Sequence, residues 1–227
     1  MGTLLAVACL AVVALAAAVL GVLLPQRRSR QLERKARDLG LTFARSATPF
    51  TGTNVSEFSM LQDGPATVVD NLIEEAMGDW RFLIFDVPLV DDSASLVTTI
   101  AAFRSHGLHL PVFQIAAKNV VERMIERTER ALGKKLIAIS PDHDFASHFF
   151  VGCSDPGELR NLLTPAKVAF LRDHAEHYHV ESSPDWLFIY RPGGRVEAED
   201  LEHFRNVSGG IASALLSLQP TRFPATA

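Results

Sequence analysis

Cysteine is almost absent from this 227-residue chain, which contains only Cys9 and Cys153. Cys9 lies inside an apolar run near the N-terminus and Cys153 lies far along the chain, so we expect no disulfide between them. The lack of a disulfide framework suits a reducing cytoplasm. Linkers rich in glycine, serine or proline are also missing from the later part of the sequence. We therefore expect its roughly 180 residues to form one domain with a single core.

Charged side chains are missing from residues 3–24, which consist largely of leucine, valine and alanine. A helix of that length is about 33 Å long, close to the roughly 30 Å thickness of a membrane's hydrocarbon core. A cleaved signal peptide is the alternative interpretation, since Ala16, Ala17 and Ala18 imitate a cleavage site. However, no Lys or Arg precedes the run, and Val19 to Leu24 extend it beyond these alanines. The pattern favours an uncleaved, single-pass membrane anchor.

Basic residues follow the apolar run within about 15 positions, where positive charge marks the cytoplasmic side of a membrane. We therefore predict an N-terminus outside and a C-terminal domain on the cytoplasmic face of the inner (plasma) membrane. The same charges attract anionic lipid, which we treat as an accompaniment to anchoring. We expect Ser29 to Leu39 to form a solvated helical neck that ends at Gly40. The membrane-proximal basic residues are Arg27, Arg28, Arg30, Arg34, Lys35 and Arg37.

Positive charge is scarce in the rest of the chain. Residues 1–45 hold seven of the 22 Lys and Arg and two of the 26 Asp and Glu, which leaves 15 basic and 24 acidic side chains, a net charge of −9, in residues 46–227. An acidic domain lacks the electrostatic surface that supplies most non-specific affinity for DNA and RNA. Nucleic acid is therefore not an expected partner.

Signatures of known catalytic and cofactor sites are absent as well. We find no phosphate-binding glycine loop, no dinucleotide fingerprint after a strand, no H-E-x-x-H and no pair of C-x-x-C motifs. Gly152-Cys153-Ser154 lacks the closing glycine of a serine nucleophile elbow. No cofactor is predicted, and the absence of these motifs favours a protein that is not an enzyme.

Strand patterns dominate the first half of the expected domain. Residues 67–77 and 80–90 flank Gly78-Asp79 and indicate a hairpin, because the second segment is rich in aromatic and β-branched side chains. Further strands are expected at 96–104 and 110–116 after short turns. Successive strands joined by short turns predict an antiparallel meander and an α+β fold. Shorter strands are expected at 41–44, 136–139, 145–153 and 186–190.

Helical periodicity appears in the second half. Residues 118–132 carry apolar side chains on one face and charged side chains on the others, as in an amphipathic helix. Asp155 and Pro156 suit the cap and first turn of a helix at 155–163. Further helices are expected at 165–177 and 199–218.

Histidines are concentrated in two places. His143 and His148 lie beside acidic residues, and His174 and His177 are three apart, a spacing that puts both on one helix face. Alternatively, polar residues gather at a helix end whose negative dipole favours histidine. No zinc-ligand spacing is met, so no metal is predicted. The candidates, if one bound, are His174, His177 and His179.

Cys153, with a histidine as its base, and Asp86 are further candidates for catalytic residues. Cys153 is a candidate nucleophile with His148 or His143 as its base, although a lone cysteine between apolar residues is more often core filler. Asp86 interrupts the apolar segment 82–85, which can mark a site. The alternative is that Asp86 faces outward near a strand end.

Several short motifs resemble those of uncharacterised bacterial membrane-anchored proteins. They are an Asn before a hairpin with an aromatic-Asp strand end (Asn71 to Asp86), Leu110-Pro111-Val112-Phe113, and a Gly-x-Asp-Pro-like turn before a helix. The last is met with a departure, as Gly152-Cys153-Ser154-Asp155-Pro156. The resemblance covers residues 67–191 and implies a soluble α+β domain behind one or two membrane segments. It implies no activity and carries no functional residue.

Taken together, the sequence predicts an anchor at 1–25, a basic juxtamembrane neck at 26–45, an α+β domain at 46–219 and a tail at 220–227. The domain is expected to have a mostly antiparallel sheet with flanking helices. Its expected function is that of a membrane-tethered binding or scaffolding domain that recruits a protein partner. The alternative is a membrane-anchored hydrolase that uses Asp86, His148 or Cys153.

Overall fold

The computed structural model describes residues 24–53, 55, 58, 61, 67–91, 94–105, 107–117, 145 and 148–216. Four predicted segments lie outside this part of the chain, apart from Leu24 at the end of the first. No helix among the described residues is long and apolar enough to cross a membrane. The four segments are the apolar run 3–24, the helix 118–132, the strand 136–139 and the tail 220–227.

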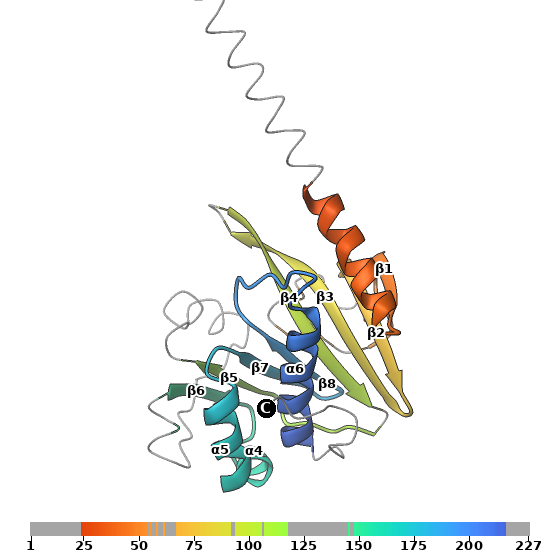
Figure 1. Ribbon diagram of the computed structural model, residues 1–227. Helices are drawn as coiled ribbons and strands as arrows, with labels where there is room; N and C mark the ends of the chain where they lie inside the picture. Colours follow the sequence, from red (N-terminus) through yellow and green to blue (C-terminus); the bar gives the residue numbers. More distant parts are fainter. Residues whose placement is uncertain are drawn as a thin grey trace, which may run out of the picture.

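The described strands form one antiparallel sheet of eight strands in the order β1-β2-β3-β4-β8-β7-β5-β6 (Figure 1). This confirms the predicted α+β class and the antiparallel sheet. The strands are β1 (Thr42–Ala47), β2 (Val69–Met77), β3 (Trp80–Asp91), β4 (Ala94–Ser105), β5 (Phe113–Ala117), β6 (Phe149–Cys153), β7 (His179–Ser183) and β8 (Trp186–Tyr190).

The predicted meander is confirmed for β2 to β4, which are neighbours in the sheet in chain order. Strands β2 and β3 turn at Gly78-Asp79, where Gly78 has a φ of 65° that suits glycine, and Met77 pairs with Trp80. Strands β3 and β4 pair along their whole length, from Trp80 opposite Ser105 to Asp91 opposite Ala94. These contacts join neighbouring parts of the sequence, so local patterns were enough to predict them.

The meander does not continue into β5, and here the prediction was wrong. The neighbour of β4 is β8, with Ala101 opposite Ile189, whereas β5 lies between β6 and β7. Strand β7 was not predicted at all, since its sequence, His-Val-Glu-Ser-Ser, has little β-propensity. All five of its residues are nevertheless buried. The middle of the sheet is therefore built from segments that are distant in sequence.

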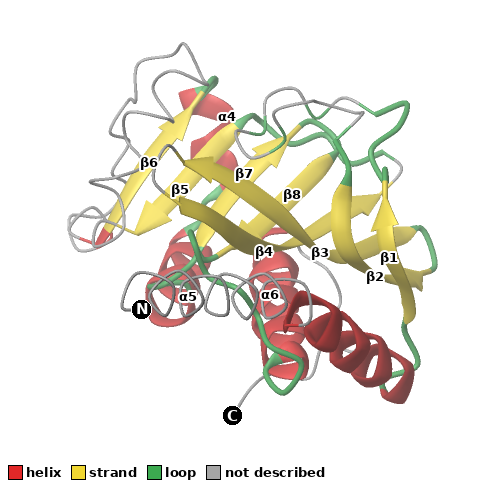
Figure 2. Cartoon of the chain, turned by 90° about the horizontal axis from the view of Figure 1, so that it is seen from above, coloured by secondary structure: helices red, strands yellow, loops and turns green. Residues whose placement is uncertain are grey.

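Helices cover one face of the sheet. Figure 2 shows α5, α6 and a further helix, residues 24–38, side by side on that face. Asp155 caps α4 by accepting hydrogen bonds from the backbone N–H groups of Gly157 and Glu158, as predicted. The three labelled helices are α4 (Pro156–Leu162), α5 (Pro165–His174) and α6 (Leu201–Leu216).

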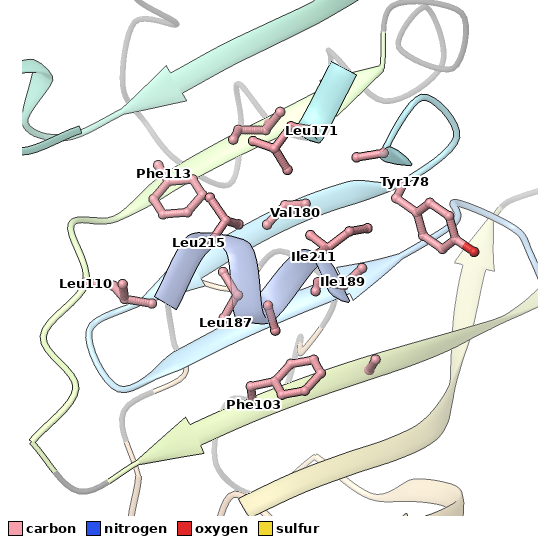
Figure 3. Close-up of a cluster of buried hydrophobic side chains, with 14 of the residues drawn as sticks. Phe103, Leu110, Phe113, Leu171, Tyr178, Val180, Leu187, Ile189, Ile211 and Leu215 are labelled. Atoms are coloured by element: carbon pink, nitrogen blue, oxygen red, sulfur yellow. The ribbon is translucent and has the colours of Figure 1, made fainter. Parts of the chain in front are cut away.

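The main core lies between these helices and the sheet (Figure 3). Ile211 and Leu215 of α6 and Leu171 of α5 point toward the strands in this view. The side chains that meet them include Phe103, Phe113, Val180, Leu187 and Ile189.

A second apolar cluster packs on the opposite face. Phe58 stacks on Phe188 with 3.9 Å between the ring centroids, and Phe50 packs edge-on against Phe85 and Trp186. The buried aromatic side chains are thus divided between the two faces of the sheet. Because both faces of the central strands are covered, those strands are buried on both sides.

The helix 24–38 is part of the folded domain, so the prediction of a solvated neck was wrong. Leu32 and Ala36, which are 3% and 0% exposed, belong to the main core. The predicted end at Gly40 is confirmed. Gly40 has a φ of 72°, and the N–H of Leu41 donates to the carbonyl of Ala36 at 2.8 Å, which is the bond pattern of a glycine-ended helix.

Candidate functional site

Asp86 lies in the middle of β3 and points to the helix-covered face. Strand side chains alternate, and Phe82 and Ile84 on the same strand belong to the main core, so Asp86 follows them to that face. Its side chain is buried, with 3% exposure for the residue. The interpretation of Asp86 as an outward-facing residue was therefore wrong.

Both carboxylate oxygens of Asp86 are occupied by hydrogen-bond donors. Oδ1 accepts from the hydroxyl of Thr99 at 2.6 Å, and Oδ2 accepts from the side-chain amide of Asn71 at 2.8 Å. The guanidinium of Arg28 donates to each oxygen, at 3.3 Å from Nη2 to Oδ1. A buried carboxylate with a paired cation and two further donors is well satisfied.

Further hydrogen bonds connect these residues to the side chain of Ser29 and to the backbone of Val196. Ser29 donates to Oδ1 of Asn71 at 2.6 Å, and Thr99 accepts from the N–H of Val196 at 3.0 Å. Arg28 also donates to the carbonyl of Val196. Asn71 has a φ of 52° where the register between β2 and β3 shifts, a conformation that asparagine tolerates better than most residues.

We call Arg28, Ser29, Asn71, Asp86 and Thr99 the Asp86 network. It joins the helix 24–38 to β2, β3 and β4 and to the loop before α6. Each carboxylate oxygen of Asp86 already accepts two hydrogen bonds, one of them from Arg28. The network is suited to fixing the helix on the sheet rather than to proton transfer.

Of the other candidate residues, Cys153 and His148 lie far from Asp86. Five strand-to-strand steps separate β3 from β6, which is about 24 Å across the sheet. Cys153 is the last residue of β6 and His148 precedes its first residue, Phe149, so the strand itself, about 13 Å long, separates them. The structure therefore brings no two of these residues together.

The environment of Cys153 also disfavours a nucleophilic role. Burial, with a smaller contribution from Asp155, raises the pKa of the Cys153 thiol and so lowers the fraction of thiolate. His148 is exposed. The second possible base, His143, lies outside the described residues.

The three candidate metal ligands point to different places. His174 ends α5, where its ring stacks on Phe170 and its Nδ1 lies 3.0 Å from the carbonyl of Phe170. His177 is exposed in the following turn, and His179 is buried in β7. Within the described residues, no three His, Cys, Asp or Glu side chains converge as metal ligands.

Sequence reasoning missed a second buried polar group on the sheet face away from the helices. Glu181, which is 5% exposed, accepts a hydrogen bond from Gln114 at 3.0 Å and another from the hydroxyl of Tyr190. His179, on the same face, is 5.4 Å from the ring of Tyr190 between centroids. Burial lowers the pKa of His179 to about 4, so its ring is neutral at pH 7.

The sequence held one signal for this group. In His179-Val180-Glu181-Ser182-Ser183, positions 179, 181 and 183 are polar and share one face of a strand. Polar residues along one face of a strand are typical of a solvated face, whereas here that face is buried. Only the tertiary packing reveals that Glu181 is an internal residue.

Comparisons with family models, curated proteins and solved structures give no match for this chain. Of the two polar groups, the Asp86 network has the clearer consequence for function. Its member Arg28 follows the apolar run so closely that the network fixes the domain next to that run.

Proposed function

We propose that the protein is a single-pass membrane protein whose domain binds a protein partner at the cytoplasmic face. Residues 3–24 would be the anchor, and the basic residues that follow support the cytoplasmic placement. The resemblance to bacterial membrane-anchored proteins agrees with this proposal. The scarcity of basic residues in the domain supports a protein partner over a nucleic acid.

The observation that carries the proposal is the burial of Arg28, only four residues after the end of the apolar run. Arg28 is 5% exposed and pairs with Asp86, and Leu32 and Ala36 of the same helix lie in the core. No flexible segment separates the end of the apolar run at Leu24 from the folded domain. The domain is therefore held close to the membrane and presents a fixed surface to a partner.

Anchoring and orientation have a direct test. The intact chain should stay in the membrane fraction after alkaline carbonate extraction. A reporter fused after residue 227 should be active only in the cytoplasm. Release of the chain by carbonate, or a reporter active only outside, would contradict the proposal.

The role in recruitment requires a second experiment. A flexible glycine–serine linker inserted between residues 23 and 24 would leave the Asp86 network intact but free the domain from its fixed position. We expect chemical crosslinking in intact cells to yield a specific protein adduct of the unaltered chain, and less of it with the linker.

The matched control is the same linker inserted after Leu216, the last residue of α6. It should leave the adduct unchanged. If no adduct forms, or if both linkers act alike, a positioned recruiting domain is the wrong description.

The hydrolase built on Asp86, His148 or Cys153 is not supported as a second function. The donors around Asp86, the separation of the three residues and the raised pKa of Cys153 each oppose it.

A further inference from the structure

The helix 24–38 carries its exposed arginines on one side. At 100° per residue, four arginines fall within an arc of about 80°. The buried residues Arg28, Ser29, Leu32 and Ala36 occupy the opposite side, centred about 170° away. We call Arg27, Arg30, Arg34 and Arg37 the arginine stripe; all four are exposed.

Most of the charge on the stripe is not neutralised. Arg37 pairs with Glu33, and Arg34 donates to the backbone carbonyl of Arg30. Arg27 and Arg30 make no ion pair with any of the residues that the structure describes. In contrast, Lys35 pairs with Glu202 of α6 at 2.9 Å. The six basic residues of this segment thus divide into two that hold the helix to the domain and four that face solvent.

The stripe begins where the apolar run ends. Even if the helix continues along the membrane normal, Arg27 lies about 4.5 Å and Arg30 about 9 Å from Leu24 along its axis. Helical side chains lean toward the N-terminus, so both guanidinium groups reach back toward the membrane. A headgroup layer about 5–7 Å thick and a Debye length of about 8 Å place both within the field of an anionic leaflet.

We propose that the arginine stripe binds the headgroups of anionic phospholipids, with Arg27 and Arg30 contributing most. This inference rests on the proposed membrane anchoring. Residues 46–227 carry a net charge of −9, so an anionic leaflet repels the rest of the domain while it attracts this side of the helix. Because Arg28 and Lys35 fix the helix to the domain, headgroup binding at the stripe also sets the orientation of the domain.

The test uses the intact chain reconstituted in vesicles of phosphatidylcholine and phosphatidylglycerol. Electron paramagnetic resonance of spin-labelled lipids measures how strongly each lipid is immobilised by the protein. We expect a preference for phosphatidylglycerol that falls about two- to fivefold for each of Arg27→Gln and Arg30→Gln, and less for Arg37→Gln. Raising NaCl to about 0.5 M should weaken the preference of the unaltered chain.

Control variants separate this effect from others. Arg160→Gln and Arg195→Gln, made separately, each remove one positive charge from an exposed position, in α4 and in the loop before α6, and should leave the preference unchanged. Arg28→Gln should also leave it unchanged while lowering the melting temperature.

The possible failures are distinguishable. If no lipid of either kind is immobilised, the chain is not inserted and the membrane anchor itself is wrong. If the chain immobilises both lipids equally, or if Arg160→Gln and Arg195→Gln each reduce the preference as much as the stripe variants do, the anchor stands and headgroup binding by the stripe is refuted.

Discussion

Asp86 shows how much of this protein depends on single residues that meet across the chain. Its partners Arg28, Asn71 and Thr99 are 58, 15 and 13 positions away in sequence. Removing one member of a buried, hydrogen-bonded ion pair leaves the other charge uncompensated, which costs more than the pair itself contributes.

We expect Asp86→Asn to lower the free energy of unfolding by about 3–5 kcal/mol, because it removes the buried counter-charge of Arg28 and leaves only the partly exposed carboxylate of Glu197, 3.5 Å from Nε. Urea denaturation followed by circular dichroism gives the value. Asp70→Asn, an exposed change on the neighbouring β2, should have little effect. A double variant, Arg28→Met with Asp86→Leu, should recover much of the loss. A small effect of Asp86→Asn would mean that the network does not hold the helix in place.

The stability of the domain should also depend on pH. His179 has a pKa of about 4 in the native protein against 6.5 for an exposed histidine, because burial disfavours its charged form. Between these values the unfolded chain binds a proton that the native protein does not, so stability falls as pH drops from about 6.5 to 4. The loss from this residue approaches about 3 kcal/mol near pH 4 and is absent above pH 7.

Urea denaturation at several pH values tests this. His179→Phe, which keeps a ring of similar size, should flatten the decline between pH 6.5 and 4. His174→Gln, at an exposed position, should not. An unchanged decline in the first variant would show that His179 is not the group responsible.

At the scale of elements, the helix 24–38 combines two surfaces with different tasks. One side packs on the sheet through Leu32 and Ala36, and the other carries the arginine stripe. Charge alone cannot separate these sides, since Arg28 on the buried side is as basic as Arg27 on the exposed side. Arg28 can be buried because it forms an ion pair with Asp86.

Leu32→Ala should destabilise the domain by about 2–5 kcal/mol, the usual cost of removing a buried leucine side chain. Thermal or urea unfolding measures the loss. Gln31→Ala, at the exposed neighbouring position, should change stability by no more than about 0.5 kcal/mol. If the two changes had equal effects, the helix would be a solvated neck that does not pack on the sheet.

In the molecule as a whole, the helix 24–38 is an integral part of the folded domain and not a segment that precedes it. A chain that begins at residue 46 would lose Arg28, Leu32 and Ala36 together and most of β1, and would leave Asp86 buried without its cation. A chain that begins at Leu24 would keep all of them.

We therefore expect the chain from residue 24 to unfold in one cooperative transition, and the chain from residue 46 to show no such transition or to aggregate. Differential scanning calorimetry and size-exclusion chromatography distinguish the two outcomes. Cooperative unfolding of the shorter chain at a similar temperature would place the domain boundary where the sequence suggested it.

Sequence alone was sufficient where the decisive residues are neighbours. The hairpin at Gly78-Asp79, the cap of α4 at Asp155 and the end of the helix 24–38 at Gly40 were predicted because each depends on a few consecutive residues. The membrane anchor and its orientation were likewise inferred from local composition, namely the apolar run and its basic flank. They remain predictions.

Tertiary structure decided the rest. It placed β8 beside β4, made the polar strand β7 internal, buried Arg28 while leaving Arg27 exposed, and separated Asp86 from Cys153. Each of these outcomes depends on contacts between residues distant in the chain. Burial of a charged group is favourable only when such a contact supplies its partner, and no local pattern of residues contains that information.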